Sequence, residues 1–512
     1  MKKIFAVLAA LSVVLSLSLT SCASTDSLAN DGRVKNVKPK KFVQEDFDRA
    51  IASGNLEDAL SMTVGRKYAK NDIIIQKMDI ALMRHFTRDY AGSAAYLNSA
   101  NEDIKNAVTQ SIAKGAIAAI GNENAKEYAG AIYESHFLNV FNALNYYNRG
   151  DLESAVALMK DLAQKRVMYD SVALAVASES DEDIEKEAAA DVAESESGKK
   201  GKKNNKKKAA KSSKSPFEVD MEAVNRRAPR KPAKEDIFTD SALERYAALN
   251  FYKMQLLDHT TPIDVRGIAE QEIEQQGKLF AVRAPSYNVT EDITIPSGQG
   301  RVNILAFSGL AGRRQEHATY FPGDFIDGMP FLPPVTIAGV TIPPFRLKFV
   351  YPEFIRKPKK IQRIVACVGS EEIELALLED FDNDIWMDVN AKAYKAFKRS
   401  MFRSILKKSA AVTAGAASIA AAGRMSDALK TIAEISASVA IDAVDLAETA
   451  DIRQVMALPS CASCGGVNLA SGVYPVTVRY FDANGALVAE DSLGNVTVRE
   501  NTLTLLESLC IR

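Results

Sequence analysis

Two cysteines near the C-terminal end have the spacing of a reactive dithiol or of half a zinc site. They stand in the sequence Cys461-Ala-Ser-Cys464-Gly-Gly. A redox pair needs its first thiolate at a helix N-terminus within a thioredoxin-like βαβ unit, but this pair follows a Leu-Pro dipeptide in a glycine-rich segment before expected strands. Zinc would need two more ligands, and Cys367 and Cys510 stand alone. We expect a structural disulfide or free thiols, with redox catalysis and zinc binding as alternatives.

The histidines form no recognisable catalytic or metal-binding motif. They are His85, His136, His259 and His317. His317 is the most interesting of them, because charged residues crowd the same proline-glycine loop. They are Arg313, Arg314, Glu316, Asp324 and Asp327. Such clusters are usually solvated ion pairs, so a hydrolase centred on His317 is an alternative rather than the expectation. The sequence also has no nucleophile elbow, P-loop or dinucleotide fingerprint, and we expect no catalytic residue, metal or cofactor.

A fifth cysteine, Cys22, follows a segment typical of secretion signals. Lys2 and Lys3 precede an uncharged apolar run from Ile4 to Leu19, which is too short for a comfortable membrane span. The run ends in Leu19-Thr20-Ser21-Cys22. This sequence resembles the lipobox of bacterial lipoproteins, in which the chain is cut before the cysteine and diacylglycerol is attached to its thiol. An ordinary signal peptide with a chance cysteine, or a signal anchor, are the alternatives.

The lipobox resemblance implies an address in the cell envelope. Residues 1–21 would be the signal peptide, and residues 22–41, which are mostly polar, a flexible tether. Two or more acyl chains, such as palmitate, hold a protein stably on a bilayer without a spanning helix. Ala23 and Ser24 follow the cysteine, with no aspartate there, which by the same resemblance favours the outer membrane.

The composition of the chain limits its possible domain organisation and binding partners. With 512 residues, 47% of them hydrophobic, the chain can bury a sizeable core and should form two or three domains. Its formal net charge of -1 gives no electrostatic reason to bind nucleic acid. Export to an oxidising compartment would permit the cysteines other than Cys22 to pair.

Residues 42–284 have a helical pattern with a recurrent turn. The sequence Gly150-Asp-Leu-Glu-Ser-Ala-Val has a near copy at Gly54-Asn-Leu-Glu-Asp-Ala-Leu, and a weaker copy begins at Arg88, 34 residues after Gly54. This step and turn resemble tetratricopeptide repeats (TPRs), in which paired helices stack into an array with a concave binding face. An unclassified helical domain is the alternative.

The segment 178–216 interrupts this pattern. Its first half is acidic and its second half is a block of lysines. Such a composition buries too little apolar surface to offset chain ordering, so we expect a disordered insertion. Its deletion should then leave the melting temperature nearly unchanged. The alternative is an electrostatic arm for teichoic acid, anionic lipid or nucleic acid.

After residue 285 the pattern changes to alternating strands. The expected strands are Val302–Phe307, Phe345–Tyr351, Ile361–Val368, Ile373–Leu378, Val476–Phe481 and Ala486–Ala489. A helical insertion spans about 385–455, in which the small residues Ala410, Ala414, Ser418 and Ala422 recur four apart and favour close helix packing over membrane insertion or oligomerisation. The fold class is therefore α+β, with a TPR-like helical domain followed by a β-sandwich-like module at 285–512.

Several segments resemble one family of bacterial proteins. They are Phe137 to Arg166, Ser241 to Asp258, and Leu446 to Arg453 followed by Leu458-Pro459. They resemble an uncharacterised family of TPR-containing envelope lipoproteins, sometimes encoded near outer-membrane lipoprotein activators of penicillin-binding proteins. Val455 stands where that family has tryptophan, and the 178–216 insertion is extra. The resemblance implies a role in envelope biogenesis and no catalytic residues.

These features predict a lipid-anchored protein that binds partners rather than an enzyme. Asn139, Asn142 and Asn145 lie beside the apolar stripe of the expected helix Ala125 to Asn148, where they could hydrogen-bond a peptide. Their alternative is a solvated helix surface. The expected partners are the membrane, through the anchor, an envelope protein, and the cell wall. The rival classes are a periplasmic thiol-redox enzyme using Cys461 and Cys464, and a surface structural antigen.

Overall fold

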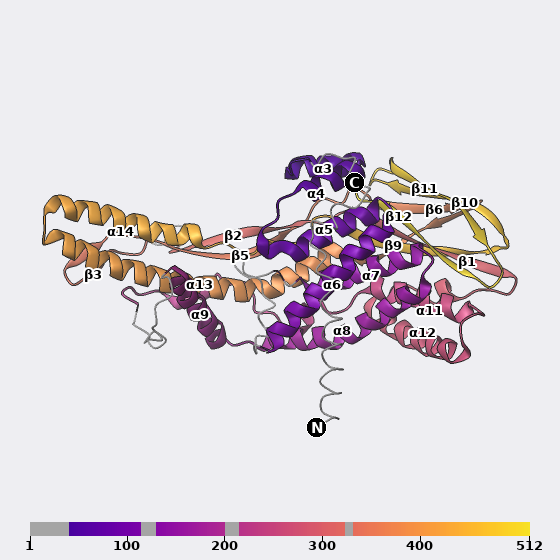
Figure 1. Cartoon of the computed structure of the whole chain (residues 1–512), viewed down its shortest axis with the longest axis horizontal. Coiled ribbons are helices and arrows are strands. Elements are labelled where there is room, and N and C mark those ends of the chain that lie inside the picture. Colours follow the sequence, from indigo (N-terminus) through magenta and orange to yellow (C-terminus); the bar gives the residue numbers. More distant parts are fainter. Residues whose placement is uncertain (1–39, 114–127, 129, 200–214, 323–330) are drawn as a thin grey trace, which may run out of the picture.

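The computed structural model describes residues 40–113, 128, 130–199, 215–322 and 331–512. The predicted signal peptide, Cys22 and nearly all of the predicted tether lie outside these residues. The described chain is mixed α+β, with most helices in the N-terminal half and the sheets in the C-terminal half (Figure 1). This arrangement confirms the predicted α+β class.

The N-terminal half consists of consecutive helices, most of which pack on other helices of the same half. They are α3 Gln44–Ser53, α4 Leu56–Gly65, α5 Ile73–Phe86, α6 Tyr90–Ala113, α7 Ile132–Asn148, α8 Leu152–Ser178, α9 Asp181–Lys199, α10 Met221–Asn225, α11 Ala242–Leu257 and α12 Ile263–Arg283. Gly54 and Gly150 end α3 and α7 with φ of 76° and 82°, a left-handed conformation that glycine adopts without strain. The next residues, Asn55 and Asp151, then cap α4 and α8. The two near copies in the sequence are therefore two similar helix-to-helix turns.

The C-terminal half contains two four-stranded sheets and two two-stranded sheets. The strands are β1 Gln299–Leu310, β2 Arg313–Phe321, β3 Val335–Ile337, β4 Val340–Ile342, β5 Leu347–Ile355, β6 Arg363–Val368, β7 Glu371–Glu374, β8 Ala376–Asp380, β9 Pro459–Ala470, β10 Gly472–Phe481, β11 Leu487–Val498 and β12 Leu503–Cys510. One four-stranded sheet has the order β12-β1-β9-β8 and the other β11-β10-β6-β7, and the two-stranded sheets are β2-β5 and β3-β4. Ile304 of β1, Ala366 of β6 and Val478 of β10 belong to one buried cluster, so the two four-stranded sheets share a core.

Most predicted strands are confirmed, with one division and five omissions. The segment Ile373–Leu378 contains two strands, β7 and β8, which belong to different sheets. The strands β2, β3, β4, β9 and β12 were not predicted. Strand β9 contains both Cys461 and Cys464. The glycine-rich loop expected at these cysteines is therefore wrong.

The main core joins the helical half to the strands. The rings of Phe137 in α7 and Phe381 are 4.3 Å apart, and those of Phe141 in α7 and Phe307 in β1 are 4.8 Å apart. All four side chains are fully buried. The change from helices to strands near residue 285 therefore marks a change of secondary structure within one core rather than a boundary between two cores.

A long helical hairpin, here called the arm, begins at the main core, and its far end projects from the rest of the molecule (Figure 1). It consists of α13 Phe381–Gly423 and α14 Asp427–Ala447, which confirms the predicted helical insertion. The two helices approach closely at Gly415, where a Cβ atom would lie 2.9 Å from that of Ala437. The predicted contact face containing Ala410 and Ala414 instead faces outward. Among the described residues, no helix is long and apolar enough to cross a membrane.

The acidic half of the 178–216 segment is ordered, so the predicted disordered insertion is wrong there. It forms α9, which packs on α13. Ile184 and Ala188 of α9 are buried, and its acidic residues pair with three buried cations of α13, which are Lys395, Lys398 and Arg399. Residues 200–214, with most of the lysine block, lie outside the described residues.

Candidate functional site

The three asparagines expected to bind a peptide are buried. Asn139, Asn142 and Asn145 each have no exposed surface. They form a ladder with α6, in which Asn139 Oδ1 accepts from Asn101, Asn142 Nδ2 donates to Asn98, and Asn145 Nδ2 donates to Ser93. The three side chains serve the packing of α7 against α6, and the prediction that they line an exposed groove is wrong.

The cysteine pair is neither a disulfide nor an accessible dithiol. The four described cysteines are free thiols. Cys461 and Cys464 are buried in β9, between β1 and β8, and side chains three apart on a strand point to opposite faces. Burial raises the pKa of both thiols, which opposes thiolate chemistry. The predicted disulfide is therefore wrong, and the geometry favours the free-thiol alternative.

His317 lies on the surface of β2. Its ring stacks on Tyr351 of the paired strand β5, and its Nδ1 is 3.2 Å from Glu353 Oε2. Glu316, its neighbour in sequence, instead accepts hydrogen bonds from Lys348 and from the Ala450 N–H. The charged residues described around His317 therefore form separate contacts and do not converge on it.

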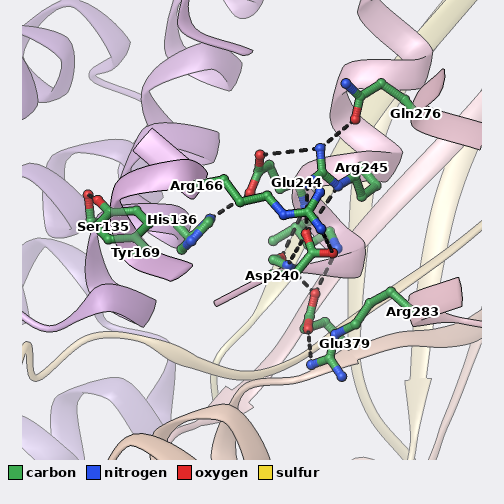
Figure 2. Close-up of polar contacts among 12 residues, drawn as sticks. Ser135, His136, Arg166, Tyr169, Asp240, Glu244, Arg245, Gln276, Arg283 and Glu379 are labelled. Atoms are coloured by element: carbon green, nitrogen blue, oxygen red, sulfur yellow. Dashed lines mark hydrogen bonds and ion pairs between the residues drawn. The ribbon is translucent and has the colours of Figure 1, made fainter. Parts of the chain in front are cut away.

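The largest unexpected feature is a buried polar network where α7, α8 and α11 meet β8 (Figure 2). His136 Nδ1 of α7 is 2.5 Å from Glu244 Oε2 of α11. Burial raises the pKa of Glu244, but the neighbouring His136, Arg245 and Arg166 outweigh it, so that the net effect is a lowered pKa. Ser135 takes no part in this pair, because its hydroxyl bonds to Tyr169 instead.

Carboxylates and guanidinium groups continue the network on its other side (Figure 2). Arg245 donates to Asp240 and to Gln276. Glu379 of β8 accepts hydrogen bonds from the Ser241 hydroxyl, from the Leu243 N–H at the start of α11, and from Arg283. The network therefore caps α11 and ties it to the sheet and to α12.

The network has the residue types of a catalytic site but not its geometry. Ser135, His136 and Glu244 lie within it, yet the serine and the histidine do not contact each other as a nucleophile and base must. His136 and Glu244 are at most 2% exposed. In the described part of the chain, no group of three or more His, Cys, Asp or Glu residues could hold a metal ion. The arrangement is that of a structural junction.

A second polar junction holds the segment 448–458, the strap, across the helical half. Glu448 accepts from Arg403 and Lys407 of α13. Further along, the Val455 N–H donates to Glu134 of α7 and the Met456 N–H to Asp79 of α5. The sequence motif Glu-x-Ala-Asp-x-Arg, singled out by resemblance, thus lies in a buried connector. Its function as a connector could not be inferred from spacing alone.

Two buried side chains of α5, Asp79 and His85, have raised pKa values, and we therefore expect the stability of the fold to decrease as the pH rises. Burial raises the pKa of Asp79 to about 7, although Arg66, the Met456 N–H and Tyr68 act against it. The folded protein therefore retains a proton that the unfolded chain loses above about pH 4, and stability declines from there to about pH 7. Burial lowers the pKa of His85, but Glu507 2.5 Å away outweighs it, and the net pKa is raised. The stabilisation that protonated His85 provides is complete below the pKa that histidine has in the unfolded chain. It is lost as the pH rises through the raised pKa of His85 in the folded protein.

The variant Asp79→Asn isolates the first of these contributions. Relative to the wild type, the variant should gain about 1 kcal/mol or more in stability between pH 5 and pH 8, because the asparagine has no proton to lose. Thermal melts of both proteins across this range measure the difference. Parallel pH profiles would show that Asp79 does not titrate in this range.

Comparison of the chain with models of protein families, with characterised proteins and with solved structures finds no match.

Proposed function

We propose that this protein is a lipid-anchored component of the bacterial cell envelope that acts by binding other proteins, and that the arm is its binding surface. The observation that carries the proposal is a row of exposed apolar side chains on α14. Ile432, Ile435 and Val439 are each about 60% exposed and Leu446 is 83% exposed. Apolar rows of this kind on a soluble surface mark sites that a partner covers.

The other faces of α14 have partners of their own. Ala433, Ala437 and Ile441 are buried against α13. Asp445 pairs with the buried Lys408, and Lys430 lies 3.9 Å from Glu434. The apolar row is therefore the face left without a partner among the described residues. A helix presenting such a row can lie in an apolar groove of another protein.

The fold details support the same proposal. We assign the helix pairs joined at Gly54 and Gly150 to a degenerate TPR-like array, and the two sheets with a shared core to a β-sandwich-like module. The resemblance of its sequence segments to TPR-containing envelope lipoproteins supports the proposal of a role in envelope biogenesis. The proposed partners are an envelope protein and the cell wall, and the proposed location is the outer membrane.

Charge placed in the apolar row should abolish partner binding. Ile432→Glu or Ile435→Glu would bury a carboxylate without a partner in any complex, and so should reduce in-cell crosslinks at α14 by tenfold or more. Thr431→Glu, an exposed neighbour outside the row, is the matched control. Equal crosslinking yields from Ile432→Glu and Thr431→Glu would refute the arm as the binding surface.

Anchoring is tested at Cys22. Cys22→Ser removes the thiol that would carry the lipid, so the variant should take up no labelled fatty acid and should leave the membrane fraction or remain uncleaved. Metabolic labelling and fractionation measure both effects. Unchanged labelling in the variant would contradict the lipoprotein assignment.

A further inference from the structure

The single tryptophan of the chain lies in a surface hollow near the start of α13. Trp386 is 43% exposed. The hollow has a volume of about 440 Å³, within the range of small-molecule sites. Its wall opposite α13 is the chain between α10 and α11, where Pro229 and Pro232 line it. The half-exposed indole on one side and the two prolines on the other give the hollow a rigid apolar lining.

Amide groups flank the indole on the same helix face. Asn383 and Asn390 lie three residues before and four after Trp386, so all three line one side of the hollow. The Arg356 guanidinium lies 5.8 Å from the indole centroid and donates to Asn383 Oδ1 at 3.4 Å. Arg356 thus holds the ring and one amide in place before any ligand arrives.

The opposite wall contributes carboxylates. Asp236 is paired with Arg230 at 2.6 Å and accepts from the Ala233 N–H. Within the described chain, neither the Glu235 carboxylate nor the Asn390 amide has a hydrogen-bond partner. The rim therefore offers free acceptors on one side and an amide, both donor and acceptor, on the other.

We propose that this hollow binds a neutral sugar ring of a glycan. The apolar C–H face of a pyranose can stack on Trp386, while its hydroxyls donate to Glu235 and exchange hydrogen bonds with Asn390. Arg230 also lines this wall but is paired with Asp236, so a phosphate or other anion would meet the unpaired Glu235 carboxylate. A proline-rich peptide offers mainly carbonyl acceptors, which carboxylates cannot pair with. The hydroxyl group, both donor and acceptor, fits this rim best.

Trp386 makes the test specific, because its emission is the only indole signal of the protein. Titration of the full chain with N-acetylglucosamine oligomers should shift that emission saturably, with matching heat in calorimetry. Asn390→Ala retains the fluorophore and should weaken binding roughly fivefold. Trp386→Ala, followed by calorimetry, should weaken it roughly tenfold or more. Asn495→Ala, an exposed asparagine of β11, should bind as the wild type does.

Three results would overturn the proposal. The first is no emission change and no heat with millimolar oligomers. The second is equal affinity of the Asn390→Ala and Asn495→Ala variants, which would place the sugar elsewhere. The third is saturation by a polyproline peptide and not by the sugar, which would make the hollow a peptide site. None of these depends on crosslinking at α14, so the arm proposal is tested separately.

Discussion

Replacing Glu134 by alanine should lower the free energy of unfolding by about 3 kcal/mol or more. The carboxylate is fully buried. It accepts hydrogen bonds from the Tyr128 hydroxyl, the Ala131 N–H and the Val455 N–H. Its removal leaves these three donors buried without an acceptor, and each costs about 1–3 kcal/mol. Because Val455 belongs to the strap, the variant should also loosen the contact between strap and α7.

Denaturant unfolding followed by circular dichroism measures this loss. Glu270→Ala, an exposed glutamate of α12, is the matched control and should change stability by less than about 0.5 kcal/mol. Glu134→Gln should fall between the two, because its amide oxygen can still accept from Val455. If Glu134→Ala proves as stable as Glu270→Ala, the strap is not held through this carboxylate.

The periodicity of α7 identified its core residues but not its neighbours. The predicted apolar stripe, including Phe137, Phe141 and Leu144, is buried. The asparagines beside it are buried as well, because α7 contacts α5, α6, α8, α11 and α13. A helix surrounded on several sides buries its polar face too. The partners of that face on α6 could not be identified until the two helices were seen together.

Strand β9 was missed because its composition is typical of a loop. Its Cys-Ala-Ser-Cys-Gly-Gly sequence lacks the β-branched residues that indicate strands. The small side chains are needed because β9 lies between β1 and β8 in a covered sheet. A Cβ atom on Gly466 would lie 2.6 Å from the Val302 carbonyl oxygen. The alternating strands β5, β6 and β10, by contrast, were predictable.

The acidic helix α9 was missed for an electrostatic reason. Its composition alone predicts a solvated chain, since single-sign segments bury little apolar surface. Its cationic partners on α13 lie about 200 residues later in the sequence, and Lys395, Lys398 and Arg399 also read as an exposed helix face. Only the fold brings the two charge sets together, at 2.7 Å for Lys395 with Glu179 and for Lys398 with Asp181. Local patterning contains no signal for such a pairing.

Deletion of residues 181–199 should therefore destabilise the protein by about 3–5 kcal/mol. The deletion leaves Lys398 and Arg399, which are 3% and 4% exposed, without their carboxylates, and removal of one partner from a buried ion pair has costs of this size. It also removes the buried contacts of Ile184 and Ala188. The melting temperature and the denaturation midpoint of the deletion variant measure the loss.

A second variant separates the stranded charges from the lost packing. Adding Lys398→Met and Arg399→Met to the deletion removes the two cations that lose their carboxylates, whereas Lys395 keeps Glu179. This variant should recover more than half of the lost stability, because apolar side chains of similar length need no partner. If the deletion alone leaves the melting temperature unchanged, α9 contributes nothing to the fold and the segment behaves as a solvated insertion. If the double change restores nothing, the loss comes from packing rather than from charge, and the ion pairs would serve only to fix the position of α9 on α13.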